Sequence, residues 1–169
     1  GSYEGFLLGG TEEELNNDET GPKIQVYLNS LGFVSGSKVN ETPHLVAILE
    51  DADGINTAGG LGHNLSVIID GEASMTYNLN EYYVSDAGGY TRGTVSYMLP
   101  ELPEGKHSLA FRAWDMMNNS STVTVEFEVV KGLAPDFANV MAITAPECGY
   151  ATFMFTHDRP ESEVGVTIE

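Results

Sequence analysis

The chain has 169 residues, with 25 acidic residues against seven Lys and Arg and a formal net charge of −18. A chain of this length can bury roughly 70% of its unfolded surface and so can form a real core. The negative charge repels a phosphate backbone and an anionic membrane surface, which disfavours nucleic-acid binding. A solvated acidic surface explains this charge more simply than a site for a cationic partner does.

The single cysteine, Cys148, cannot form an internal disulfide, and the Cys and His residues lack zinc-site spacing. No apolar run approaches the roughly eighteen residues of a membrane-spanning helix, and residues 1–10 lack the basic start of a signal peptide. The leading Gly1-Ser2 pair is typical of a cloning remnant. We therefore expect a piece of a longer chain, with residues 1–20 serving as a linker whose acidic part is TEEELNNDET.

From Pro22 onward the chain alternates apolar and polar residues with the period of two that is typical of strands. In KIQVYLN, for example, Ile24, Val26 and Leu28 share one face. The pattern predicts six strands, at residues 23–29, 44–50, 64–70, 92–99, 106–115 and 122–130.

Glycine-containing turns separate these strands, at Asp53-Gly54, Asp70-Gly71, Gly88-Gly89 and Glu104-Gly105. Glycine accepts the positive φ that tight turns require. Short strands with turns between them predict two packed sheets, so we expect an all-β, antiparallel Ig-like β-sandwich over residues 21–131.

A second break follows at residues 132–135, and the remaining sequence offers about three more strands. Three strands are too few for a closed sandwich. We expect residues 132–169 to be a short β tail that either docks on the sandwich or begins a second, truncated β unit.

Two acidic residues suggest a calcium loop, because Asp51 and Asp53 are followed by Gly54. The pattern then breaks, because no glutamate stands at the twelfth position. An Asp-Gly turn explains these residues without a metal. We expect no cofactor; calcium at Asp51 and Asp53, helped by Glu50 or Asp70, is the alternative.

A nucleophile and base pair would require Cys148 to meet His63, His107 or His157, since an imidazole activates a thiol. Cys148 lies in a Pro-Glu-Cys-Gly turn without a known nucleophile motif. We therefore expect no catalytic residue in this chain.

The stretch AWDMMNNSS places the only tryptophan, Trp114, beside Asp115. Asp115, Asn118 and Asn119 have short polar side chains that bond nearby backbone and define turns. These four residues predict a structural hairpin corner. We expect Trp114 to pack between the sheets, so that Trp114→Ala costs about 3 to 5 kcal/mol and Asp115→Ala about 1 to 2 kcal/mol.

Two sets of motifs carry a family resemblance. DADGIN, LPEGKHSLAF and DMMNNSS resemble the turns of bacterial Ig-like domains. In order and separation, GPKIQVYLN, GINTAGGLGHNL, LNEYY and AWDMMNNSS resemble the region after the peptidase domain in gingipain-like sortases of the Bacteroidetes type IX secretion system, relatives of the C25 peptidases. The strand ATFMFTHDRP resembles the sorting domain of that family, although ITAPECGY replaces its usual proline-asparagine-proline turn.

The resemblance implies a noncatalytic accessory module of a cell-surface cysteine peptidase, with the catalytic Cys and His in an upstream α/β domain. The implied partners are that peptidase domain and an outer-membrane protein, and the implied location is the extracellular face of the outer membrane. The alternative is a generic Ig-like module for adhesion or carbohydrate contact. Five tyrosines can help to distinguish these functions: Tyr77, Tyr82, Tyr83, Tyr90 and Tyr97. If several are exposed on one face, they favour contact with a sugar or protein; if they are buried, they belong to the core.

Overall fold

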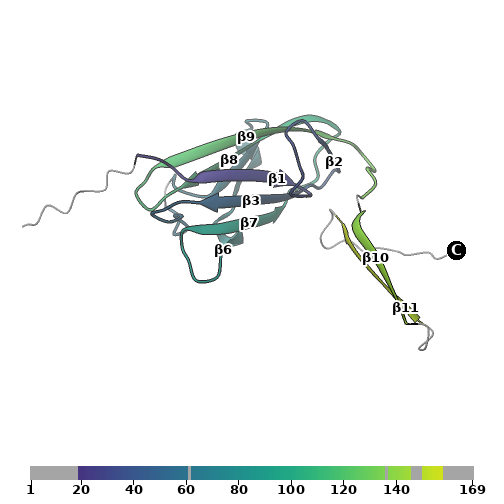
Figure 1. Cartoon of the computed structure of the whole chain (residues 1–169). Helices are drawn as coiled ribbons and strands as arrows, with labels where there is room; N and C mark the ends of the chain where they lie inside the picture. Colours follow the sequence, from purple (N-terminus) through teal and green to yellow (C-terminus); the bar gives the residue numbers. More distant parts are fainter. Residues whose placement is uncertain (1–18, 61, 136, 146–149, 158–169) are drawn as a thin grey trace, which may run out of the picture.

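The computed structural model describes residues 19–60, 62–135, 137–145 and 150–157; within 137–156 it describes the backbone alone. Its main feature is a pair of β-sheets (Figure 1). The four-stranded sheet has the order β1 (Lys23–Leu28), β3 (His44–Glu50), β7 (Arg92–Met98), β6 (Tyr83–Ser85). The five-stranded sheet has the order β2 (Lys38–Val39), β9 (Ser120–Val129), β8 (Gly105–Trp114), β4 (Ser66–Ile69), β5 (Thr76–Asn78).

The all-β, two-sheet prediction is confirmed, and each of the six predicted strands corresponds to one of the longer strands. One detail of the antiparallel prediction is wrong, because β2 pairs with β9 in parallel through Lys38↔Glu128 and Val39↔Val129. Two single-turn 3-10 helices, Ala73–Met75 and Asn80–Tyr82, flank the short strand β5.

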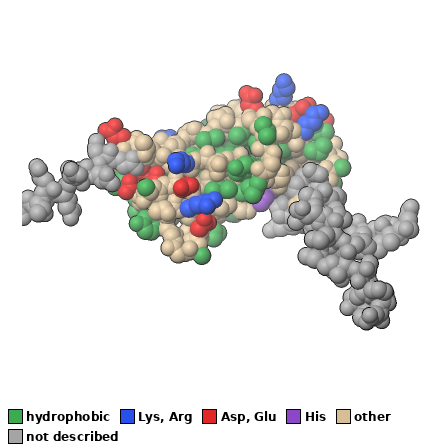
Figure 2. All heavy atoms as spheres, viewed as in Figure 1, with side chains coloured by type: hydrophobic (Ala, Val, Ile, Leu, Met, Phe, Trp, Pro, Cys, Tyr) green, Lys and Arg blue, Asp and Glu red, His purple; other side chains and the backbone are tan. Residues whose placement is uncertain are grey.

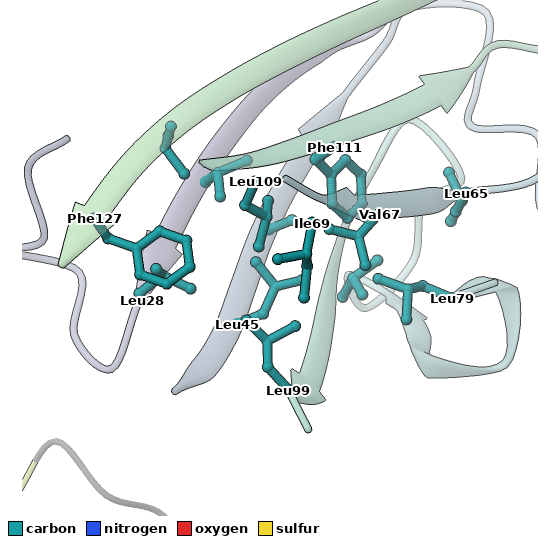
Figure 3. Packing of buried hydrophobic residues seen from close by; sticks show 14 of the residues in the cluster. Leu28, Leu45, Leu65, Val67, Ile69, Leu79, Leu99, Leu109, Phe111 and Phe127 are labelled. Carbon is teal, nitrogen blue, oxygen red and sulfur yellow. The ribbon is translucent and has the colours of Figure 1, made fainter. Parts of the chain in front are cut away.

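The core lies between the two sheets, because alternate residues of each strand point inward (Figure 3). In β8 the inward series is Leu109, Phe111 and Ala113, each fully buried. Side chains from β1 and β3, including Leu28 and Leu45, meet this series from the opposite sheet. Burial of these apolar side chains is the main stabilising term of the sandwich.

Gly93 lets a tyrosine close one side of the core. Gly93 is buried in β7, and a Cβ built there would lie 2.4 Å from Cζ of Tyr83 and 2.6 Å from the carbonyl oxygen of Val84. No side chain fits at this position without moving the backbone of β6. The absence of a side chain therefore allows the Tyr83 ring to cover the glycine and pack against the core.

The tail contributes a separate two-stranded antiparallel sheet, made of β10 (Phe137–Ala145) and β11 (Tyr150–His157). The third strand expected near the end of the chain and Cys148 lie outside the described residues. The domain boundaries at residues 20 and 131 stay predictions.

The chain enters the sandwich at one end and leaves it at the other (Figure 1). Gly21 lies against Ser120, the first residue of β9, since a Cβ on Gly21 would lie 2.5 Å from the Ser120 carbonyl carbon. The β6–β7 and β8–β9 loops occupy this entry end, because Thr91 and Ser120 both lie close to Gly21. Val129, the last of the ten residues of β9, lies at the opposite end.

Candidate functional site

The Trp114–Asp115 corner contains a carboxylate with a complete set of hydrogen bonds. Asp115 is 0% exposed. Its Oδ1 accepts the backbone N–H groups of Met117 at 2.8 Å and of Asn119 at 2.7 Å, and its Oδ2 accepts the Asn119 side-chain amide at 2.8 Å. Asn118 takes a left-handed conformation with φ 70°, which asparagine tolerates. These bonds fix the β8–β9 turn.

Trp114 does not lie between the sheets, which corrects the expectation from the sequence. Strand alternation makes Ala113 face the core and turns Trp114 to the outer face of the five-stranded sheet, where it is half-buried. The ring has two neighbours: the His63 ring, which meets it edge to face with centroids 4.3 Å apart, and the Arg112 guanidinium, 4.4 Å from the ring centroid. Among the described residues, no hydrogen-bond partner meets the buried Nε1 of Trp114.

Asp51 and Asp53, the calcium alternative, form a local turn. Asp51 is buried, and its Oδ1 accepts the backbone N–H of Asp53 at 2.9 Å. Gly54 completes the turn with φ 97°. Asp70 lies away from this turn, against His107 on β8. The part of the chain with described side chains contains no group of three His, Cys, Asp or Glu that could hold a metal ion, and a calcium site stays a hypothesis.

The histidines are distributed among separate surroundings. His63 contacts Trp114, and His107 contacts Asp70. His157 ends β11 and is half-buried. Cys148 lies outside the described residues. Among the described side chains one imidazole does meet a hydroxyl: His44 Nε2 lies 2.8 Å from Ser96 Oγ, across the exposed face of the paired strands β3 and β7.

A contact between His107 and Asp70 was not foreseen from the sequence. The His107 Nδ1 lies 2.7 Å from Asp70 Oδ2, and its Nε2 lies 2.8 Å from the carbonyl oxygen of Pro103. Asp70 Oδ1 also accepts the backbone N–H of Ser108 at 2.8 Å. The sequence did contain a signal, because His107 belongs to the same odd-numbered series as the inward residues Leu109 and Phe111.

These contacts perturb the Asp70 carboxyl. Burial alone would raise its pKa, but the hydrogen bond from Ser108 N–H and the contact with His107 outweigh burial, so the pKa of Asp70 is lowered. A lowered pKa favours the folded state while the carboxylate is charged. The stabilisation is present above the ordinary carboxyl pKa of about 3.9 and is lost as the pH falls through the folded value.

We expect Asp70→Asn to lower the free energy of unfolding by about 1 kcal/mol at neutral pH, because the Asp70 side chain is one-third exposed and solvent weakens the pair. Asparagine keeps the left-handed φ of 53° accessible at this position. The difference from the natural chain should shrink as the pH falls below the ordinary carboxyl pKa of about 3.9 and through the lower folded pKa of Asp70, where the carboxylate takes up its proton. Urea unfolding across this pH range measures it, with the exposed Glu72→Gln as control; a difference that persists in acid would contradict the assignment.

The five tyrosines divide into two groups. Tyr77, Tyr83 and Tyr97 are half-buried and pack against the core. Tyr82, with its edge against the Tyr97 ring, is 44% exposed, and Tyr90 is 70% exposed. Most of these five tyrosines therefore close the sandwich, and the two exposed ones, Tyr82 and Tyr90, lie in different segments.

The chain is similar to PorU from Porphyromonas gingivalis, as seen in a crystal structure of the dimeric latent protein. The two are 39% identical with a TM-score of 0.71, over 89% of this chain and 14% of the PorU chain. The chain therefore spans about one-seventh of the length of PorU.

Two further solved structures share only low similarity. An endo-β-1,4-mannanase from Thermotoga petrophila is 14% identical with a TM-score of 0.42, over 64% of this chain and 20% of that one. CopC from Methylosinus trichosporium OB3b is 17% identical with a TM-score of 0.38, over 65% of this chain and 98% of that one. These scores are too low to carry an argument. No protein-family model and no curated protein sequence matches the chain.

Proposed function

Because this chain is a PorU-related region, we propose that it is a noncatalytic accessory β-sandwich module of a gingipain-like cysteine peptidase and sortase of the type IX secretion system. The observation that carries the proposal is the 39% identity over 89% of the chain. The module supports the peptidase domain of the same parent chain or docks it at the outer membrane. We place it on the extracellular face of the cell.

The proposed fold is Ig-like, and the strand order supports this. The order β1-β3-β7-β6 corresponds to strands A, B, E and D of an Ig domain, and β9-β8-β4 corresponds to G, F and C. β5 extends the second sheet beyond strand C, as in variable-type domains, and β2 adds a short parallel partner to strand G. Ig-like domains present their loops at the two ends of the sandwich, which suits a module that contacts other domains at its ends.

The roles of the polar side chains support a module without catalysis. The Asp115 carboxylate is occupied by three donors that close a turn, and Asp51 closes another. Both ring nitrogens of His107 already have partners. Each of these groups has a structural task.

Among the described residues, no helix has the length and apolarity required to cross a membrane.

We expect the purified chain to leave arginine, lysine and sorting-signal peptides uncleaved, because Cys148 stands in a Pro-Glu-Cys-Gly segment that matches no known nucleophile motif. The assay follows peptide products by mass spectrometry, with the full-length parent as positive control and Cys148→Ala as matched variant. Cleavage by the natural chain that Cys148→Ala abolishes would contradict the proposal.

Adhesion or carbohydrate contact is the second candidate function. Exposed Tyr82 and Tyr90 favour it, since aromatic side chains provide stacking surfaces for partners. Binding of the isolated chain to an array of surface glycans, lost in Tyr82→Ser or Tyr90→Ser, would support this function over the first.

A further inference from the structure

Three large apolar side chains are exposed together at the entry end of the sandwich. Tyr90, in the β6–β7 loop, is 70% exposed, and Met116 and Met117, in the β8–β9 turn, are 58% and 52% exposed. Figure 2 shows apolar side chains at the end where the β6–β7 loop projects. We call Tyr90, Met116 and Met117 the entry-end cluster.

Gly54 joins the two loops that carry the cluster. A Cβ on Gly54 would lie 2.7 Å from the Tyr90 ring, so the ring rests on the glycine backbone. The carbonyl oxygen of Gly54 accepts the Met116 N–H at 3.0 Å, and the carbonyl oxygen of Tyr90 accepts the Ile55 N–H at 3.3 Å. Tyr90 and Met116 therefore occupy adjacent places although they are 26 positions apart in sequence.

The backbone beneath the cluster is firmly held. Asp115 fixes the turn through the N–H groups of Met117 and Asn119. Asn56 N–H donates to the Trp114 carbonyl at 2.9 Å, and Asp51 N–H donates to the Thr91 carbonyl at 2.7 Å. A cluster of exposed apolar side chains on a fixed backbone resembles the preorganised centre of a protein interface more than a mobile loop tip.

The path of the chain indicates what covers this cluster. Thr20 and Gly21 line a hollow together with Asp51, Ala52 and Thr91, so the incoming chain passes beside the residue that follows Tyr90. The chain spans only 14% of the length of PorU. The part of a PorU-like parent that precedes the sandwich therefore approaches it from the end that carries the entry-end cluster.

We propose that the entry-end cluster is the surface on which the preceding domain of the parent chain docks, through an apolar hollow in that domain. The inference rests on the proposed function, which supplies the preceding peptidase domain.

Methionine oxidation in the intact full-length parent tests the proposal with an internal control. Met98, on the β7 strand end far from the cluster, is only 39% exposed, whereas Met116 and Met117 are 58% and 52% exposed. Exposure alone therefore predicts that hydrogen peroxide oxidises the two cluster methionines first. Docking predicts the reverse order, with Met116 and Met117 oxidised about fivefold more slowly than Met98, or slower still.

A paired variant adds a second readout. Tyr90→Ser with Met116→Ser should release the docked domain and raise the oxidation rate of the remaining Met117. Leu31→Ser with Val34→Ser, which removes two exposed apolar side chains from the β1–β2 loop, should leave that rate unchanged. Far-UV circular dichroism and thermal unfolding show whether each variant keeps its fold.

Oxidation of Met116 and Met117 as fast as Met98 in the parent would overturn the docking proposal. Protection that disappears when the parent is diluted to monomers would also overturn it, because the occupant would then be a second copy. Either outcome, in a parent that carries a peptidase domain, leaves the proposed function standing. A parent without such a domain would remove the proposed function itself.

Discussion

Replacing Asp115 with alanine is expected to lower the free energy of unfolding by about 3 to 5 kcal/mol. Asp115 is 0% exposed, and its loss leaves the N–H groups of Met117 and Asn119 and the Asn119 amide without their acceptor. It also loosens the turn that sets the register of β8 against β9. Urea unfolding followed by circular dichroism measures the change.

Trp114→Ala provides the comparison, and we expect it to lower the free energy of unfolding by about 1 to 2 kcal/mol. The substitution removes a half-buried ring from the outer face of the sheet, together with its cation–π contact with Arg112. The sequence alone predicted the opposite order of these two effects. If Trp114→Ala proved more destabilising than Asp115→Ala, the placement of both side chains at this corner would be wrong.

Phe111→Ala is expected to lower the free energy of unfolding by about 3 to 5 kcal/mol, because it leaves a cavity at the centre of the core. Phe111 is fully buried in β8, opposite Val67 of β4, and belongs to the one buried cluster that spans both sheets. Thermal and urea unfolding should show a single cooperative transition at a lower midpoint.

Leu31→Ala is the matched control, since Leu31 is 65% exposed and its removal should change stability by less than about 0.5 kcal/mol. A Phe111→Ala variant as stable as the control would mean that the two sheets do not pack through Phe111.

The longer strands were predictable because the inward residues repeat with a period of two over several positions. β2, β5 and β6 were not, because each has only two or three residues and too few alternations to recognise. Their places depend on pairing with longer strands, such as β7 with β6 through Val95↔Tyr83.

The alternation of inward and outward residues in β8 also predicts which side chains of the Trp114–Asp115 corner are buried, and it does so better than residue type. Leu109, Phe111 and Ala113 define an inward odd-numbered series in β8, which places Asp115 inside and Trp114 outside. Residue size had favoured the tryptophan for the interior. At this strand end, the alternation of the strand therefore predicts which side chain is buried better than residue size does.

The entry-end cluster could not be predicted from the sequence. Tyr90, Gly54 and Met116 come from three different connections, and their meeting depends on how the strands are ordered in the two sheets. Alternation along one strand does not supply that order. The structure was required to bring them together.

Determining the coding sequence upstream of residue 1 in the parent gene tests the central claim most directly. The account predicts an α/β domain with alternating strands and helices, in which one strand end carries a histidine and the next a cysteine, so that imidazole and thiolate meet at the edge of a parallel sheet. An upstream region made only of further sandwich repeats would contradict the account and identify the chain as part of an adhesin stalk.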